Sequence, residues 1–181
     1  MQTSRLELVR LDKSHVPGYH AIWSDPFATR WSTHGPCETV EATVEVPPGW
    51  LELHGGLRRG FLGWVGTWKS EPTPEVGFIF HRAAWGFGFA TEALQAFLGI
   101  FWQSKPQFDM LDAFCDTENL ASTRVLQKCG FELMQRLEGD YTLPWMEPSL
   151  RHTLHYRATR GHIGEMSNHT ARPDPHEAAG A

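Results

Sequence analysis

The sequence predicts an α/β domain, chiefly because a strand, a turn and a helix follow one another near its centre. Residues 75–80 form an apolar run that suits a buried strand. A turn with two glycines follows at 81–89, and residues 90–102 place apolar side chains on one helical face. With 181 residues the chain is long enough for one domain with a substantial core. We expect that domain over 1–160, followed by a disordered tail at 161–181, which is polar and rich in Pro, Gly and Ala.

The segment before this central unit predicts three strands and two helices. Residues 5–11 alternate polar and apolar side chains, as a half-buried strand does. Ser14 is a suitable N-cap for the first helix, and Asp25 with Pro26 ends that helix. The expected elements are a strand over 5–11, a helix over 15–23, a helix over 38–45, a short strand over 50–53 with a turn at 54–56, and a strand over 61–68.

The segment after the central unit predicts three more strands and one more helix. Asn119 precedes the helix, and Gly130 is a natural C-cap for it. The last two strands again alternate polar and apolar residues. The expected elements are a strand over 110–115, a helix over 120–129, and a closing pair of strands over 131–134 and 150–158 with a loop at 138–149 between them.

Composition and charge argue against several classes of function. Hydrophobic residues make up 41% of the chain and charged residues 20%, which is ordinary for a soluble globular protein. The net charge of −5 argues against a nucleic-acid partner, whose binding requires a basic face. No apolar run approaches the ~20 residues of a membrane span, and the N-terminus lacks the apolar core of a signal peptide. We therefore expect neither a nucleic-acid nor a membrane partner.

The cysteines indicate a reducing compartment. Cys37, Cys115 and Cys129 are odd in number and have no paired spacing, which argues against a disulfide framework and against a zinc site. A cytoplasmic location without a bound metal fits this usage best. Cys115 ends an expected strand, where an inert buried thiol is favoured over a covalent acyl-cysteine.

The central turn is a candidate phosphate site. Gly86 and Gly88 let the backbone approach a ligand closely. The helix that follows directs its unpaired N–H groups and the positive end of its dipole into the turn. A dinucleotide-binding fingerprint is disfavoured, because its third glycine would fall at Thr91 and no acidic residue ends a strand about twenty residues later.

Two runs, 85–93 (WGFGFATEA) and 118–131 (ENLASTRVLQKCGF), each preceded by a strand, resemble the GNAT superfamily of acyl-CoA N-acyltransferases. The segments 5–8 and 22–26 also match the RimJ/RimL-type branch, which includes the ribosomal-protein N-terminal acetyltransferases. The resemblance covers residues 3–160. It implies a GNAT fold, with a mixed, twisted, mostly antiparallel sheet of six to seven strands flanked by helices. It further implies that acetyl-CoA lies in the gap between two splayed central strands.

The resemblance assigns residues to the coenzyme. The backbone of the central strand would bind the pantetheine arm, and the N–H groups of the turn would hold the pyrophosphate. Asn119 would sit beside the arm, and Ser122 near its sulfur. Arg124 and Lys128 are partners for the outer phosphate or, equally well, residues of a solvated helix face. The residues implied in coenzyme binding are Phe78, Ile79, Phe80, Trp85, Gly86, Phe87, Gly88, Phe89, Ala90, Thr91, Asn119 and Ser122.

The chain departs from the family pattern at three places. Ala83, or Trp85 if Gly88 and Ala90 are taken as the pair, stands where the phosphate turn usually carries Gln or Arg, but backbone amides are expected to suffice. Leu126 stands where many relatives have a tyrosine that protonates the departing thiolate, and Ser122 is the expected substitute. The segment 39–60 is compressed, which affects the acceptor side more than the coenzyme side.

Acetylation of an amine also requires a base and an acceptor pocket. Glu75 and His81 flank the central strand, and Glu75 is the favoured base. A solvated residue at the start of a strand accounts for Glu75 equally well, and His81 suits the end of a strand near the phosphate turn. The segments expected to wall the acceptor pocket, in which some residues only pack, contain Trp23, Trp31, His34 and Tyr141.

The resemblance thus implies an acetyl-CoA-dependent N-acetyltransferase. We expect a primary amine, on a small molecule or at a protein N-terminus, to attack acetyl-CoA directly in a ternary complex. A catalytically inactive acyl-CoA-binding module is the alternative. The protein is expected to be a monomer or a homodimer.

Overall fold

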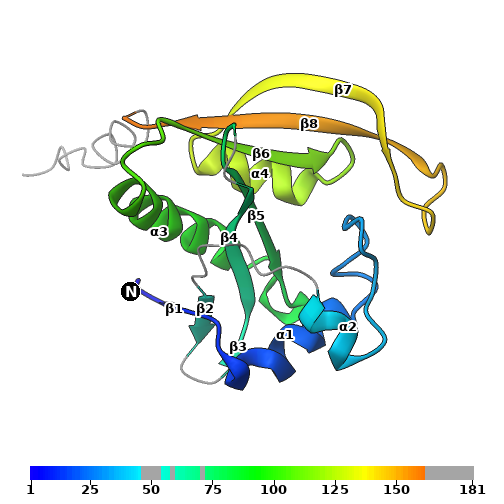
Figure 1. Cartoon of the computed structure of the whole chain (residues 1–181), viewed down its shortest axis with the longest axis horizontal. Helices are drawn as coiled ribbons and strands as arrows, with labels where there is room; N and C mark the ends of the chain where they lie inside the picture. Colours follow the sequence, from blue (N-terminus) through cyan, green and yellow to red (C-terminus); the bar gives the residue numbers. More distant parts are fainter. Residues whose placement is uncertain (46–53, 58–59, 70–71, 162–181) are drawn as a thin grey trace, which may run out of the picture.

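The computed structural model describes residues 1–45, 54–57, 60–69 and 72–161. The expected strand at 50–53 and the expected disorder of the C-terminal tail beyond Gly161 lie outside the described residues. The α/β fold class is confirmed (Figure 1). The elements are β1 (Glu7–Val9), η1 (Lys13–His15), α1 (Val16–Trp23), α2 (Val40–Glu45), β2 (His54–Leu57), β3 (Gly60–Phe61), β4 (Gly63–Lys69), β5 (Glu75–Phe80), η2 (Arg82–Ala84), α3 (Phe89–Ser104), β6 (Met110–Asp116), α4 (Leu120–Lys128), β7 (Glu132–Thr142) and β8 (Leu150–Thr159).

The strands form two hydrogen-bonded sheets. The larger has the order β4-β5-β6-β8-β7, and the smaller has the order β1-β2-β3. All neighbours in the larger sheet are antiparallel except β5 and β6, which are parallel. That parallel pairing is a single residue pair, Glu75 opposite Asp112. Figure 1 shows the result: β4 and β5 leave β6, β8 and β7 at a steep angle.

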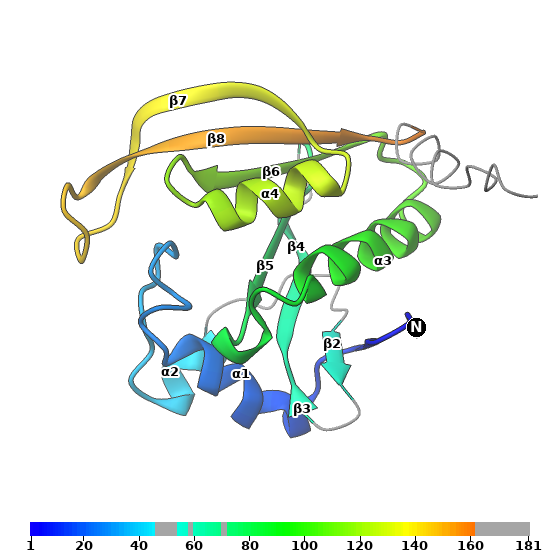
Figure 2. The same ribbon diagram turned by 180° about the vertical axis from the view of Figure 1, so that it is seen from behind.

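The core lies between α3 and the larger sheet, with α4 closing one end. The period of α3 puts its large apolar residues on one face, and Leu94, Phe97 and Phe101 are buried there. The sheet contributes Val65 and Tyr156, among others, to the same cluster. Both helices lie on one side of the gap between β5 and β6 (Figure 2).

The structure corrects the expected cap of the first helix. Asp12, not Ser14, begins the helical segment, and its Oδ1 accepts a hydrogen bond from the Ser14 backbone N–H (2.8 Å). Asp12 takes this role because its backbone is extended while its carboxylate reaches the first turn of η1. Pro17 then falls in the first turn of α1, where its missing N–H costs little.

Two expected loops are wrong. Residues 54–56 do not form a turn; they belong to β2, whose Gly56 pairs with Glu7 of β1. Residues 138–142 continue β7, so the connection to β8 is only 143–149. A register shift between Leu137 and Tyr141, with Gly139 at a φ of +59°, lets the strand continue where its sequence pattern breaks. The single strand expected over 61–68 is divided between β3 and β4.

In the part of the chain that the structure describes, no helix is long and apolar enough to cross a bilayer.

Candidate functional site

The site is organised by the divergence of β5 from β6. The Asp112 N–H of β6 donates to the Pro74 carbonyl (2.9 Å), just before β5 begins. Beyond the pair formed by Glu75 and Asp112 the two strands share no register (Figure 1). The edge of β5 that faces β6 is therefore open along most of its length.

Three hydrogen bonds establish which backbone groups face this gap. The Pro74 carbonyl points toward β6, and the His81 N–H donates to Leu62, beside β4. The Phe80 carbonyl accepts from the Trp85 indole (2.8 Å) and so points away from β4. Because successive residues of a strand direct their backbone groups to opposite edges, even-numbered residues face the gap. Of the three expected pantetheine contacts, Phe78 and Phe80 satisfy this condition, whereas the backbone groups of Ile79 point toward β4.

The two candidate bases lie at opposite ends of β5. Glu75 is half-buried at the closed end, opposite Asp112. His81 is the N-cap of η2, where its Nδ1 accepts from the Ala83 N–H (3.1 Å). The lone pair of that nitrogen is therefore already used within the turn, which leaves Glu75 as the stronger candidate.

The turn after β5 has the geometry of an anion site. Gly86 and Gly88 have φ values of +80° and +79°, and Gly88 is the N-cap of α3 without any side-chain cap. Among the described residues, the N–H groups of Gly86, Phe87 and Gly88 have no backbone acceptor. The first N–H groups of α3 are unpaired for the ordinary helical reason. All these donors stand at the positive end of a sixteen-residue helix.

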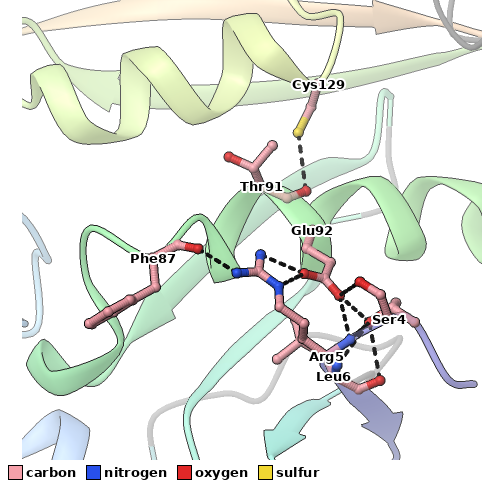
Figure 3. Close-up of polar contacts among 8 residues, drawn as sticks. Ser4, Arg5, Leu6, Phe87, Thr91, Glu92 and Cys129 are labelled. Carbon is pink, nitrogen blue, oxygen red and sulfur yellow. Dashed lines mark hydrogen bonds and ion pairs between the residues drawn. The ribbon is translucent and has the colours of Figure 1, made fainter. Parts of the chain in front are cut away.

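The N-terminal segment is hydrogen-bonded to this turn, a contact that the sequence alone did not suggest. Arg5 donates to the Phe87 carbonyl (2.8 Å) and to Glu92 in the first turn of α3 (Figure 3). Burial tends to raise the pKa of Glu92, but hydrogen bonds from Thr3 and Arg5 outweigh it and keep the pKa below its usual value. Glu92 is therefore ionised at neutral pH.

Helix α4 brings Asn119 and Ser122 to the end of β6. The Asn119 Oδ1 accepts from the Ser122 N–H (3.2 Å), so the expected capping role of Asn119 is confirmed. Ser122 is half-buried in the first turn. Leu126, one turn further, is 1% exposed and belongs to the core.

Cys115 is the penultimate residue of β6 and lies beside the first turns of α4. Its Sγ lies 3.7 Å from the Thr123 hydroxyl. Burial raises the pKa of this thiol, so Cys115 is protonated at neutral pH and is a poor nucleophile. This agrees with the expectation of an inert thiol, although Cys115 is half-buried and not fully buried.

On the other side of the gap, Trp31 and Tyr141 meet at a buried ion pair that sequence reasoning missed. The Asp116 carboxylate accepts two hydrogen bonds from Arg151 (2.8 and 2.9 Å) and one from the Tyr141 hydroxyl (2.5 Å). The Arg151 guanidinium lies over the Trp31 ring, 5.6 Å from its centroid. Glu118 also pairs with Arg151 (2.9 Å), so this one guanidinium has two carboxylate partners.

The other two expected acceptor residues differ in burial. Trp23 is only 8% exposed and packs with Tyr19, Cys37 and Trp64, so most of its surface serves packing. His34 is exposed and stands edge-on to Trp23, with 6.1 Å between ring centroids. The loop that carries His34 and Trp31 reaches the tip of the β7–β8 hairpin, where the Trp145 indole donates to the Arg30 carbonyl (3.0 Å; Figure 2).

A second polar cluster lies on β6 and β8. Arg157 binds Asp112 through two hydrogen bonds (2.6 and 2.8 Å), and His155 Nε2 lies 3.2 Å from the same carboxylate. The His155 ring stacks on Phe114, with 4.6 Å between centroids. Within the described residues, no group of three or more His, Cys, Asp or Glu side chains is placed to hold a metal ion.

Comparison with known proteins gives one family. The sequence profile of the acetyltransferase (GNAT) domain matches residues 5–132. The uncharacterised protein YkkB of Bacillus subtilis is 37% identical over 62 residues, and the match spans only 36% of its length. The uncharacterised N-acetyltransferase p20 of Bacillus licheniformis is 24% identical over 155 residues, which cover 78% of this chain and 86% of p20.

Solved structures share the fold at low identity. The ribosomal L7/L12 α-N-protein acetyltransferase RimL, in complex with coenzyme A, has a TM-score of 0.75 at 19% identity and covers 87% of this chain and 95% of its own. Spermidine N-acetyltransferase from Vibrio cholerae, in complex with CoA and spermine, has a TM-score of 0.76 at 13% identity and covers 89% of this chain and 99% of its own.

Proposed function

Because this chain belongs to the GNAT acetyltransferase family, we propose that it is an N-acetyltransferase that moves the acetyl group of acetyl-CoA to a primary amine. The observation that carries the proposal is the open edge of β5 leading directly into the turn at Gly86 and Gly88. One continuous backbone track thus offers donors first to an amide-containing arm and then to phosphates. The coenzyme is a cosubstrate, and the proposed reaction requires no metal.

The coenzyme is placed by these backbone groups. Phe78 and Phe80 face the gap and would bind the pantetheine amides. The N–H groups from Gly86 to Thr91 would hold the pyrophosphate at the positive end of α3, whereas the Trp85 N–H already donates to the Arg82 carbonyl (3.1 Å) and is not available as expected. Asn119 and Ser122 would lie beside the arm, at the start of α4. RimL and the spermidine enzyme, which share the fold, have both been solved in complex with CoA, which supports CoA as the kind of ligand.

The chemistry follows from that placement. The amine nitrogen attacks the thioester carbonyl, whose oxygen gains negative charge and is stabilised by a backbone N–H of β5. The C–S bond then breaks; the Ser122 hydroxyl gives its proton to the departing thiolate and takes up one from water, so no serine alkoxide remains. The proton released by the amine passes through water to Glu75, because Glu75 lies at the closed end of the gap. Direct attack in a ternary complex needs no acyl-cysteine, in agreement with the raised pKa of Cys115.

The acceptor enters from the side of Trp31 and Tyr141. The buried Asp116 is paired with Arg151, which also pairs with the exposed Glu118. His34 is exposed on the loop that carries Trp31, and its ring stands edge-on to the buried Trp23 ring. The fold neighbours include enzymes for a protein N-terminus and for a polyamine. We assign the chain to the RimJ/RimL-type branch, with a small amine or a protein N-terminus as the acceptor, and we place it in the cytoplasm as a monomer or homodimer.

The proposal is tested in two steps. Acetyl-CoA should first raise the melting temperature of the protein. Release of free thiol from acetyl-CoA should then be measured over a panel of polyamines, small primary amines and peptides with free N-termini. At least one acceptor should support turnover, and Ser122→Ala should lower kcat about 100-fold while changing acetyl-CoA binding far less.

Two results would contradict this proposal. A protein that acetyl-CoA does not stabilise lacks the coenzyme site altogether. Binding without turnover on any acceptor, and with no effect of Ser122→Ala, would identify an inactive acyl-CoA-binding module instead.

A further inference from the structure

We propose that Arg5 is a positioning residue for the coenzyme: it fixes the peptide between Phe87 and Gly88 so that the turn can bind the pyrophosphate. Arg5 lies just before β1, far from the turn in sequence, and no substrate contact is assigned to it. The inference rests on the proposed function, because it takes the turn to be the phosphate site.

Arg5 contacts the turn at three points (Figure 3). Its Nη1 donates to the Phe87 carbonyl (2.8 Å). Its Nε and Nη2 both donate to Oε2 of Glu92 (2.7 and 2.6 Å). Its guanidinium also covers the Phe89 ring, 4.7 Å from the centroid. The planar fork therefore joins the loop before α3 to the first turn of α3.

The bond to Phe87 sets the direction of a donor. In a trans peptide the carbonyl and the following N–H point in opposite directions. Since the Phe87 carbonyl points at Arg5, the Gly88 N–H points to the other side of the turn. Phe87 has a glycine on each side, Gly86 and Gly88, and both have positive φ. Glycine reaches either sign of φ easily, so without an anchor this peptide is free to rotate.

The ion pair with Glu92 reduces the repulsion between the Glu92 carboxylate and a bound pyrophosphate. Glu92 is an ionised carboxylate in the first turn of α3, close to where a pyrophosphate would bind. Its oxygens accept hydrogen bonds from the Thr3 hydroxyl (2.5 Å), the Ser4 hydroxyl (3.1 Å) and the Arg5 backbone N–H (3.0 Å), besides the guanidinium. The N-terminal segment thus binds the Glu92 carboxylate, and the Arg5 guanidinium neutralises its charge.

No other cation next to the turn has this role in the described structure. Arg82 lies in η2, but its Nε donates to Asp25 (2.5 Å) and its guanidinium lies over Phe27, 4.8 Å from the ring centroid. The N-terminal hydroxyls cannot replace Arg5, because only the guanidinium reaches both Phe87 and Glu92.

The test uses the full chain with Arg5→Gln and Arg5→Lys. The matched control is Arg136→Gln, which removes an exposed ion pair with Glu138 (2.7 Å) on β7. Binding is measured by calorimetry or ligand-detected NMR, for acetyl-CoA and for S-acetylpantetheine, which lacks the pyrophosphate and the nucleotide. This comparison needs no knowledge of the acceptor.

The expected result is selective for the phosphates. Arg5→Gln should weaken acetyl-CoA binding about tenfold, as one lost charge-assisted hydrogen bond implies, and leave S-acetylpantetheine binding unchanged. Arg5→Lys keeps the charge without the fork and should recover only part of the affinity. Should Arg5→Gln fold poorly, the folded Arg5→Lys variant must still show the same selectivity.

Three outcomes would overturn the inference. If wild type binds acetyl-CoA and both Arg5 variants bind it equally well, Arg5 does not position the turn. An equal loss for both donors would indicate a general structural role. If the wild type fails to bind acetyl-CoA at all, the proposed function fails first and the role of Arg5 falls with it.

Discussion

The conformation of Gly88 makes a quantitative prediction about stability. Gly88 has a φ of +79°, where an L-residue is strained by about 1–2 kcal/mol. A Cβ at this position would meet only the Arg5 Nη2, at 3.6 Å, so steric overlap adds nothing. Gly88→Ala should therefore lower the free energy of unfolding by about 1–2 kcal/mol through backbone strain alone.

The same helix supplies a matched control. Gly99 lies inside α3, its φ is not positive, and a Cβ there would meet nothing within 4 Å. Gly99→Ala should raise the free energy of unfolding by about 0.5–1 kcal/mol, because alanine loses less backbone entropy in a helix. The two substitutions add the same methyl group to one helix and should have opposite signs.

Urea denaturation measures the contrast. With an m-value of about 2 kcal/mol/M, a difference of about 2 kcal/mol separates the two midpoints by about 1 M. The midpoint of Gly88→Ala should lie below that of the wild type, and the midpoint of Gly99→Ala above it. A Gly88→Ala protein as stable as the wild type would refute the left-handed conformation and, with it, the direction assigned to the N–H groups of the turn.

Three further predictions concern the buried polar groups. Asp116→Asn removes the buried counter-ion of Arg151 and leaves only the exposed Glu118 as its partner, so it should lower the free energy of unfolding in urea by about 3 kcal/mol, whereas a loss below about 1 kcal/mol would show that the pair is open to solvent. Burial tends to raise the pKa values of Asp112 and Asp116. Their hydrogen bonds to arginine lower these pKa values by more than burial raises them, so both lie below the usual 3.8. Their contribution to stability is therefore complete above that pH and lost as the pH falls through the depressed values; unfolding measured from pH 6 to pH 2 should show this loss, and Asp116→Asn should reduce its slope. Cys115→Ala should keep full activity at neutral pH, since burial raises the pKa of the thiol, and an inactive but folded variant would point to a covalent intermediate.

The central unit was predictable from sequence because its information is local. The apolar run of β5, the two glycines and the apolar face of α3 lie within thirty residues and specify their own conformations. The same holds for α4, where Asn119 caps the helix and Gly130 follows it at a φ of +80°. In both cases short-range chemistry decides the result.

The sequence predictions were wrong or incomplete where contacts between distant segments determine the structure. The strand β7 continues past Glu138 because a bulge near Gly139 preserves its pairing with β8, and the residue pattern alone reads as a loop. The packing of Trp23 depends on Trp64, which reaches it from β4. Which residues of such distant segments meet is set by the fold, so an aromatic-rich segment did not reveal which rings are buried.

The polar networks were missed for the same reason. Asp116 and Arg151 are 35 residues apart and meet only because β6 and β8 pair in one register. Arg5 and Glu92 are 87 residues apart. The sequence did hold one indication of both pairs. Glu92 stands beside the predicted phosphate site and Asp116 beside the predicted acceptor site, and a charge buried at such a place requires a partner.

The most direct test of the account is a crystal structure of the protein with acetyl-CoA. We predict that the pantetheine arm runs along the open edge of β5 at Phe78, and that the pyrophosphate accepts hydrogen bonds from N–H groups between Gly86 and Thr91. The acetyl group should then lie within reach of Ser122, with the Phe87 carbonyl still bound to Arg5. Coenzyme bound elsewhere, or a turn in which the Gly88 N–H points away from the phosphates, would contradict the account.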